Sequence, residues 1–351
     1  MFISISIFFC NFVCGKEIKD YFCTGKIIII KKFFKDMISR RILRTKALHT
    51  LYGFQMWNKC DNKNDRRDPF KDALNQLDYS IDKSYELYNY MLLLVVDVAK
   101  YATERIEFGK NKKRPNQEEL NPNTRFIDNK VIDQLLNNSQ FQIYLKDNKI
   151  SWVNDEFVIK KVYKSLIESD FYKKYMNCPN PTYKDDKQVI IDLFAKVVVN
   201  NEDFFEALEE KSIFWNDEIE FVMSMVIKTI KTFNQDDTEW KRLMNKFANS
   251  DDEEFVTNLF KKAVVNHDKN IELINKFTHN WDIDRIAFID TLLMELAITE
   301  LNEFKSIPVK VTLNEYIDLA KEYSTKSSKN FINGVLDKIS AEVRIENALV
   351  K

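Results

Sequence analysis

Apolar residues recur at steps of three and four along most of the chain, which is the period of amphipathic α-helices. The longest such pattern lies between residues 81 and 106, at Ile81, Tyr85, Tyr88, Leu92, Val95, Ala99, Ala102 and Ile106. This spacing predicts a long helix that packs on another helix, with Ser80 as its N-cap. Residues 91–96 are apolar on every side, so we expect that part of the helix to be buried all round.

The same period predicts helices on both sides of this long one. Before it, Leu43, Leu48 and Leu51 mark the buried face of a helix within residues 37–59. After it, helical patterns cover residues 129–147, 153–176, 186–210, 217–233, 271–277 and 283–304, and a last helix runs from 328 to past 339. Two more helix starts are predicted by capping boxes, which pair Ser250 with Glu253 and Thr312 with Glu315.

The composition supports an all-α fold. The chain has five Gly and six Pro among 351 residues, which is few for a protein rich in turns, and 30% of its residues are charged. Only three glycines lie beyond residue 36, and they are far apart. A loop that cradles phosphates with backbone N–H groups needs clustered glycines, so the composition argues against mononucleotide- and dinucleotide-binding sites.

Cysteine and histidine show no pattern typical of catalysis or metal binding. The five cysteines include no Cys-x-x-Cys pair and have no histidine at ligand spacing, so we expect no zinc site and no other cofactor. The three histidines are separated from any nucleophile, so we expect the protein not to be an enzyme. An odd number of cysteines without an evident secretion signal fits the reducing cytoplasm.

Residues 1–36 differ in character from the rest of the chain. They contain two apolar runs, at residues 2–9 and 27–30, which are too short to span a bilayer. The first run has no basic residues before it and no small-residue cleavage site after it, which argues against a signal peptide. We interpret Met37 as the natural start and residues 1–36 as an N-terminal extension that is non-native or disordered. The alternative is a short membrane-associating tail.

Residues 109–124 form the clearest linker in the chain. They contain two prolines and four closely spaced basic residues, Lys110, Lys112, Lys113 and Arg114. The simplest interpretation of this segment is a solvated connection between helices. Among the helices that follow, we expect the side chains of Trp152, Trp215 and Trp240 to pack in the core.

The segment 37–59 carries a local positive charge on a chain whose net charge is -1. It has no acidic residue and five basic ones, namely Arg40, Arg41, Arg44, Lys46 and Lys59. Four of them lie towards the N-terminal end of the predicted helix, where the helix dipole disfavours cations. An anionic partner is one reason for this placement, and a solvated cationic helix end, with Tyr52 in the core, is the alternative. Single-stranded RNA would fit as the partner, because it is bound through its phosphates and by stacking of its bases on aromatic side chains such as Tyr52.

Three segments of the sequence carry a resemblance to a known family. The first is Arg40-Arg41-Ile42-Leu43-Arg44, followed by Ala47-Leu48 and Leu51-Tyr52-Gly53-Phe54-Gln55. The second holds Trp281, Arg285, Asp290, Leu296-Ala297 and Glu300-Leu301. The third runs from Pro308 to Lys338 and includes Asn314-Glu315, Ala320-Lys321 and Phe331-Ile332-Asn333-Gly334. Together these segments resemble the NusB family of transcription antitermination factors.

The resemblance implies an all-α, NusB-like helical bundle with an inserted helical region, because residues between about 60 and 215 have no counterpart in the short form of the family. It divides the chain into an arginine-rich helix and a long helix (37–110), the inserted region (111–215) and a C-terminal NusB-like domain (216–351). Gly334 lies inside the last helix, where glycine costs about 1 kcal/mol relative to alanine. We therefore expect close approach at Gly334, by a neighbouring helix rather than by a ligand.

NusB-like proteins bind the boxA element of nascent RNA together with the ribosomal protein NusE, and they help RNA polymerase to read through terminators, notably on ribosomal RNA operons. The resemblance thus implies boxA-like RNA, NusE and the RNA polymerase antitermination complex as partners, a cytoplasmic location and no membrane. The RNA-binding residues that it implies are Arg40, Arg41, Arg44, Lys46, Tyr52, Lys326, Lys329 and Phe331. For Tyr52 and Phe331, packing in the core is an equally good interpretation. The residues implied to face NusE are Asp290, Thr291 and Met294.

Two alternatives belong to other classes of function. The first is a NusB-like helical protein-interaction scaffold without RNA binding, which keeps only protein contacts or self-association. The second is an enzyme, since NusB-like domains also occur fused to RNA cytosine methyltransferases. Such a fusion needs a glycine-rich cofactor loop and a catalytic cysteine on a strand-rich domain, and the sequence shows neither.

Overall fold

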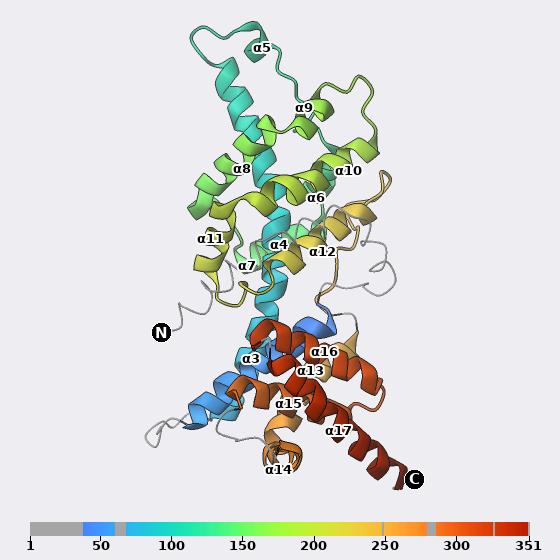
Figure 1. The fold of residues 1–351 in the computed structure, drawn as a ribbon. Helices are drawn as coiled ribbons and strands as arrows, with labels where there is room; N and C mark the ends of the chain where they lie inside the picture. Colours follow the sequence, from blue (N-terminus) through green and yellow to red (C-terminus); the bar gives the residue numbers. More distant parts are fainter. Residues whose placement is uncertain (1–37, 60–67, 248, 279–285, 326, 350–351) are drawn as a thin grey trace. The chain divides into compact units, whose positions relative to one another are not determined.

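The computed structural model describes residues 38–59, 68–247, 249–278, 286–325 and 327–349, with the side chains of 343–349 excepted (Figure 1). Within these ranges the protein is helical and contains no strand, which confirms the predicted all-α fold class. The chain forms two compact units, and one boundary between them falls inside helix α4. We call residues 38–82 and 247–349 the terminal unit, and residues 83–246 the middle unit. The predicted extension, residues 1–36, lies outside the described residues.

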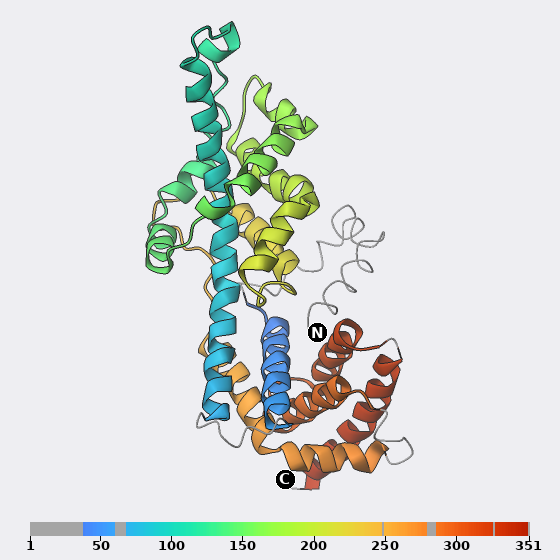
Figure 2. The same ribbon diagram turned by 90° about the vertical axis from the view of Figure 1, so that its left-hand side faces the viewer.

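The terminal unit is built around helix α15. Its helices are α3 (Arg40–Lys59), the start of α4 (Pro69–Lys110), α13 (Ser250–Val265), α14 (His267–Thr278), α15 (Phe288–Glu303), α16 (Val309–Tyr323) and α17 (Ser328–Leu349). α15 packs against α3, α13, α14, α16 and α17, and every residue from 292 to 301 is buried. α3 runs antiparallel to the start of α4 (Figure 2), where the rings of Phe54 and Phe70 lie 6.2 Å apart. The arginine-bearing helix α3 is therefore part of the packed bundle.

The middle unit contains shorter helices than the sequence predicts. Besides the rest of α4 they are α5 (Gln117–Leu120), α6 (Lys130–Leu136), α7 (Ser139–Asn148), a 3₁₀ turn (Val153–Asp155), α8 (Glu156–Glu168), α9 (Asp170–Met176), α10 (Tyr183–Asp192), a π-helical turn (Leu193–Val197), a 3₁₀ turn (Val198–Asn200), α11 (Glu202–Lys211) and α12 (Ile219–Thr232). Three predicted helical windows are each interrupted. New helices begin after Asn138, Ser169 and Asn201, because each of these side chains accepts a hydrogen bond from a backbone N–H of the following turn.

Two tryptophans hold the core of the middle unit against α4, as the sequence predicts. Trp152 and Trp215 are buried, with ring centroids 4.1 Å and 5.7 Å from that of Tyr90. Each indole N–H donates to a backbone carbonyl of α4, at 3.1 Å and 2.7 Å. Residues 91–96 are all buried, which confirms the expectation for the apolar part of α4. Trp240 is 68% exposed, so its predicted packing role is wrong.

Two predicted helix starts are wrong because an upstream side chain caps the helix first. α4 begins at Pro69, after Asp68 accepts hydrogen bonds from the next two backbone N–H groups of the chain (3.0 and 3.2 Å), and Ser80 lies within the helix. Proline is well placed at the first position of a helix, where its missing N–H would have no partner. α13 is capped by Asn249, which leaves Ser250 as the first helical residue.

The start of α16 also differs from the predicted capping box. The N-cap is Pro308, and Thr312 lies inside the first turn, where its hydroxyl donates to Glu300 instead of capping the helix. The preceding helices start at His267 and Phe288 rather than near 271 and 283, and residues 279–285 lie outside the described residues. α17 begins at Ser328, as predicted.

Candidate nucleic-acid interface

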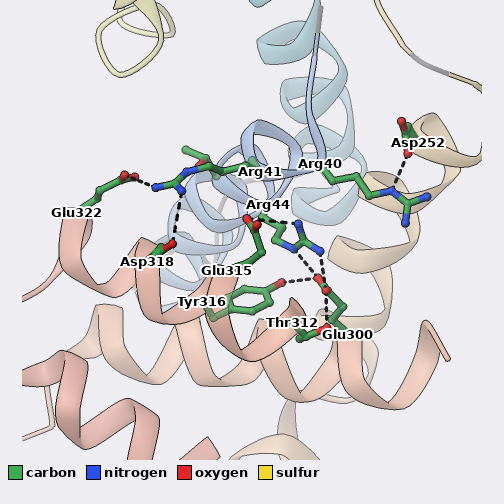
Figure 3. Close-up of polar contacts among 11 residues, drawn as sticks. Arg40, Arg41, Arg44, Asp252, Glu300, Thr312, Glu315, Tyr316, Asp318 and Glu322 are labelled. Carbon is green, nitrogen blue, oxygen red and sulfur yellow. Dashed lines mark hydrogen bonds and ion pairs between the residues drawn. The ribbon is translucent and has the colours of Figure 1, made fainter. Parts of the chain in front are cut away.

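The basic residues of α3 are paired with acids that other helices supply. α3 has no acidic residue in its first turn, so nothing on the helix itself offsets the cations near its N-terminus. Arg40 places Nε 2.7 Å from Oδ1 of Asp252 on α13 (Figure 3). Its guanidinium also lies 5.1 Å from the ring centre of Phe255, within the range of a cation–π contact.

Arg41 makes a more exposed set of contacts with α16. It forms an ion pair with Glu322, and its Nη1 lies 3.8 Å from Oδ2 of Asp318 (Figure 3). The side chains of Arg41 and Glu322 are 41% and 51% exposed. Ion pairs of this kind contribute about 0–1 kcal/mol, so Arg41 can change partner at little cost in stability.

Arg44 lies in the core of the terminal unit, where it ties α3 to α15 and α16. Its Nε and Nη2 donate to the two carboxylate oxygens of Glu300, at 2.8 and 2.7 Å, and both side chains are almost fully buried. Glu300 also accepts from Thr312 at 2.8 Å and from Tyr316 at 3.2 Å (Figure 3). A carboxylate of Glu315 lies 3.6 Å from Nη1 of the same arginine. Such a bidentate, fully hydrogen-bonded pair is the geometry in which a buried ion pair is tolerated.

The pKa values in this buried network keep its groups in one protonation state. Burial by itself lowers the pKa of Arg44, but the hydrogen bonds and charge of Glu300 outweigh it and raise the pKa above the usual value. Burial, followed by the charge of Glu300, raises the pKa of Tyr316 well above its usual value. At neutral pH the guanidinium is therefore charged, and the tyrosine hydroxyl stays protonated as a donor.

Two of the predicted RNA-binding residues are enclosed by the protein. The residues Arg44 and Lys46 are each 2% exposed. A phosphate in solvent cannot reach either charge in this structure. Their visible role is in the packing of α3, and the accessible charge of the predicted site belongs to Arg40 and Arg41, whose side chains are 38% and 41% exposed.

Aromatic rings lie along the solvent-exposed side of α3, which includes His49 and Gly53 and which we call its outer face. Tyr52 is half-buried against Phe288, with ring centroids 5.5 Å apart. Lys59 is exposed and holds its Nζ 3.6 Å from the centre of the same Phe288 ring. One turn before Tyr52, the exposed His49 meets Tyr323 of α16 edge-on at 5.2 Å. Tyr52 was predicted either to pack in the core or to contact RNA. In the structure one part of its side chain packs on Phe288 and another part is accessible to solvent.

The turn between α16 and α17 adjoins this face of α3, because Tyr323 is the last residue of α16. The hydroxyl of Ser324 in this turn is hydrogen bonded to Asp290 of α15. Lys329 is half-buried in the first turn of α17 and makes no ion pair within the described part of the chain, while Phe331 is half-buried and in contact with other groups. Lys326 lies outside the described residues.

The residues predicted to face a protein partner differ in accessibility. Asp290 and Met294 are buried inside the terminal unit, at 3% and 0% exposure, and Asp290 is occupied by Ser324. Thr291 is half-buried and so retains some accessible surface. Any contact of a partner with this part of α15 therefore involves Thr291 rather than the other two.

The expectation for Gly334 is wrong. A Cβ built at this position meets no atom of the described structure within 4 Å, so no neighbouring helix requires a glycine there. Gly334 is exposed on α17, and Gly53 is exposed on α3 with the same open space. Both helices therefore present a stretch of bare backbone to solvent.

One polar cluster of the terminal unit was missed by the sequence analysis, which treated His267 as isolated. Its Nδ1 lies 2.9 Å from Oε1 of the fully buried Glu295 and 3.1 Å from Nε2 of Gln55. The hydrogen bond to Glu295 raises the pKa of His267, and burial raises the pKa of Glu295. A glutamate in the otherwise apolar stretch 292–298 was the signal that could have indicated a buried partner.

Two further features concern the described ranges. No three His, Cys, Asp or Glu side chains there are grouped so that they could hold a metal ion. Of the helices in the same ranges, none combines the length and the apolar character that crossing a membrane requires.

Comparison with known proteins gives matches to one family. The model of the NusB family matches residues 217–341, a range that combines α12 with α13–α17 and excludes α3. The chain is 40% identical over 98 residues to the transcription antitermination protein NusB of Salinibacter ruber, covering 28% of this chain and 61% of the relative. It is 37% identical over 112 residues to that of Thermodesulfovibrio yellowstonii (31% and 74%) and 36% identical over 115 residues to that of Nitratiruptor sp. (33% and 78%).

The extent of these matches differs between relatives. The chain spans 61% and 65% of the length of the NusB proteins of Salinibacter ruber and Natranaerobius thermophilus, and about three quarters of the other two. Each match covers about a third of this chain or less. No solved structure matches the chain.

Proposed function

This chain belongs to the NusB family, and from that membership we propose that it is a transcription antitermination factor that binds boxA-like single-stranded RNA together with the ribosomal protein NusE. In this proposal the protein acts in the cytoplasm within an RNA polymerase antitermination complex and promotes read-through on ribosomal RNA operons. The relatives named above carry the name transcription antitermination protein, and the RNA and protein partners are proposed for this chain.

The observation that carries the proposal is the outer face of α3, where accessible cations and aromatic rings occur together. Arg41 lies at one end of this face, and Tyr52, with Lys59 over the neighbouring Phe288, lies towards the other end. Arg40 extends to the opposite side of α3, towards Asp252 of α13 (Figure 3). Cations bind the phosphates of a nucleic acid, and aromatic rings stack with its unpaired bases. The combination therefore suits single-stranded RNA. The exposed backbone at Gly53 leaves room for close approach of a nucleotide.

We propose that the start of α17 adds to this surface, because the turn before it follows Tyr323, which contacts α3. Lys329 adds a cation without an ion pair in the described part of the chain, and Phe331 adds a second half-buried ring. Lys326, which precedes them in the sequence, stays a predicted RNA contact. Arg44 and Lys46 are assigned a supporting role, because their burial fixes the position of α3 under the RNA. For NusE we propose a contact at the exposed part of Thr291.

Binding of a labelled boxA-like RNA to the full chain tests the proposal, with and without NusE. Three accessible cations, Arg40, Arg41 and Lys329, predict a log–log slope of affinity against salt of about -2, at about -0.7 for each phosphate of a single strand. Replacing Arg41 and Lys329 by glutamine is expected to reduce the slope by about 1.4 and to weaken binding. Arg44 is left unchanged in this test, because its loss would destabilise the packing of α3.

A matched control removes the same charge elsewhere on the terminal unit. Lys71 and Lys269 are exposed cations without an ion pair in the described part of the chain, and they lie on α4 and α14. The double variant Lys71→Gln/Lys269→Gln should bind RNA as the wild type does. The proposal fails if both double variants bind alike, or if the wild type shows no affinity for boxA-like RNA in the presence of NusE.

One observation favours the second candidate, a helical protein-interaction scaffold without RNA binding. Arg40 and Arg41 already have acidic partners within the protein, in Asp252 and Glu322. If these pairs are their only function, the protein should retain NusE in a pull-down at a salt concentration where it shows no affinity for RNA.

A further inference from the structure

The end of α4 and its connection to α5, residues 109–116, form a built loop and not the plain linker predicted from composition. Asn116 and Glu119 cap each other reciprocally, since each side chain accepts from the backbone N–H of the other (2.7 and 2.9 Å). Glu119 also pairs with Lys112. A Cβ at the buried Gly109 would lie 3.4 Å from Cγ of Glu119, which is van der Waals distance, so α5 folds back close to the end of α4. We call residues 109–116 the basic loop.

The basic loop presents cations that the protein does not neutralise. It has four basic residues and no acid, and of these only Lys112 has an ion pair within the described part of the chain. Lys110, Lys113 and Arg114 are exposed. The helix dipole stabilises a cation within the last turn of a helix, which accounts for Lys110 at the end of α4. Lys113 and Arg114 lie beyond that turn, so the dipole does not explain them.

An aromatic ring lies beside these cations. Phe108, one residue before the basic loop, is 62% exposed, and Nζ of Lys112 lies 6.0 Å from its ring centre. The cation that this ring meets is the paired Lys112, and the unpaired Lys113 and Arg114 follow it directly in the chain. An exposed ring within a few residues of unpaired cations matches the two needs of a single-stranded nucleic acid, stacking for a base and positive charge for phosphates. An acidic protein surface would match the cations but would leave the ring without a role.

We propose that the basic loop and Phe108 form a second RNA-binding site, which takes single-stranded RNA flanking the boxA-like element. In this site Lys113 and Arg114 contact phosphates, and a base stacks on Phe108. The inference rests on the proposed function, because it assumes that the terminal unit binds the same RNA. Two linked sites on one strand raise the overall affinity, since the second contact forms at the effective concentration set by the RNA between them.

Two RNAs separate this site from the one on α3. One is a boxA-like RNA of about 12 nucleotides, and the other carries the same element with unstructured flanks, about 40 nucleotides in all. The wild-type full chain should bind the longer RNA more tightly. The variant Lys113→Gln/Arg114→Gln should lose the additional affinity for the longer RNA and keep the wild-type affinity for the short RNA. Its salt slope for the longer RNA should be smaller than that of the wild type by about 1.4.

Phe108→Ala tests stacking and should weaken binding of the long RNA at least about fivefold, because stacking of one base contributes about 1–3 kcal/mol. Matched controls come from the same unit. Lys130 and Lys146 are exposed and without ion pairs in the described part of the chain, and Phe157 is 49% exposed on α8. The variants Lys130→Gln/Lys146→Gln and Phe157→Ala should bind both RNAs as the wild type does.

The inference is overturned if the wild type binds the two RNAs equally, or if Lys113→Gln/Arg114→Gln keeps the increment. It is also overturned if that variant loses retention on immobilised polyglutamate while its RNA affinities are unchanged, because the loop then serves an acidic protein surface. Failure of the proposed function is a separate result, namely absence of binding to the short RNA. Binding of the long RNA that depends on the basic loop would in that case still be detected.

Discussion

Replacing Arg44 by methionine is expected to destabilise the terminal unit by about 3–4 kcal/mol. The change removes the only bidentate partner of Glu300 among the described residues and leaves a carboxylate with 0% exposure. With charge centres about 4 Å apart and an effective dielectric constant of about 20, the lost attraction is about 4 kcal/mol. Breaking one partner of a buried pair costs about 3–5 kcal/mol in general. Thr312 and Tyr316 still donate to Glu300, which places the expectation in the lower part of that range.

Amide hydrogen exchange measured by mass spectrometry reports this loss locally. In Arg44→Met the opening free energy measured for peptides from α15 and α16 should be about 3–4 kcal/mol lower than in the wild type. Peptides from α8 and α12 in the middle unit should be unchanged and serve as internal controls. Unfolding monitored by a global probe would mix the two units and would not give a single free energy.

Three companion variants test the cause. Arg44→Lys keeps the charge but loses the bidentate geometry, so its loss should be intermediate. Glu300→Gln should cost less than Arg44→Met, because Glu315 remains 3.6 Å from the guanidinium. The double variant Arg44→Met/Glu300→Gln should be at least about 1 kcal/mol more stable than Arg44→Met alone, since no uncompensated charge stays buried. The reasoning is refuted if Arg44→Met lowers the opening free energy of α15 and α16 by less than about 1 kcal/mol, or if the double variant is the less stable of the two.

Three further predictions concern other parts of the terminal unit. Glu322→Gln frees Arg41 from an exposed ion pair and should tighten boxA-like RNA binding by up to about fivefold in an anisotropy titration; weaker binding would contradict a role of Arg41 at phosphates. Gly334→Ala should raise the opening free energy of α17 in amide hydrogen exchange by up to about 1 kcal/mol, because the added Cβ meets open space, and a loss of stability would show that something packs there. The pKa of His267 is raised first by its hydrogen bond to Glu295, and that of Glu295 first by burial, so the folded unit holds protons more tightly than the unfolded chain. The stability of the terminal unit should therefore fall as the pH rises, from above about 4.5 for Glu295 and from above about 6.5 for His267, up to the raised pKa of each group. Glu295→Gln should flatten this dependence in the amide hydrogen exchange of α14 and α15; an unchanged profile would exclude the pair as its source.

The sequence predicted helices well wherever periodic burial dominates. The apolar positions of α4 and the buried run 91–96 follow from spacing alone, because a helix that buries one side must repeat at 3.6 residues. The first residues of the helices were predicted less well. Ser80, Ser250 and Thr312 each suit an N-cap, but a competing Asp, Asn or Pro upstream caps the helix first, and the period of apolar residues does not distinguish between such candidates.

The candidate site was predictable as a set of segments but not as a set of accessible charges. The family resemblance indicated α3 and the start of α17, and the structure joins α3 to the end of α16 through Arg41 and His49. Burial of Arg44 was not predictable from its neighbours, because its partner Glu300 is 256 residues away. A signal was nevertheless present, since Glu295 and Glu300 interrupt an otherwise apolar helix. Acids on such a helix indicate buried partners.

The arginines near the start of α3 therefore divide into two kinds, and the division explains a placement that the helix dipole disfavours. Arg44 is compensated by Glu300 inside the core, so its charge serves folding and requires no external anion. Arg41 is compensated by Glu322 at an exposed site, where a phosphate can replace a carboxylate at similar free energy. Arg40 is itself partly exposed, but its partner Asp252 is buried, so exchange of that carboxylate for a phosphate costs more. The number of cations in the segment consequently overstates the number of phosphate contacts. A salt slope near -2 for the short boxA-like RNA fits this division, whereas a slope near -3 would require one more cation, such as Lys59 or Lys326, to contact a phosphate.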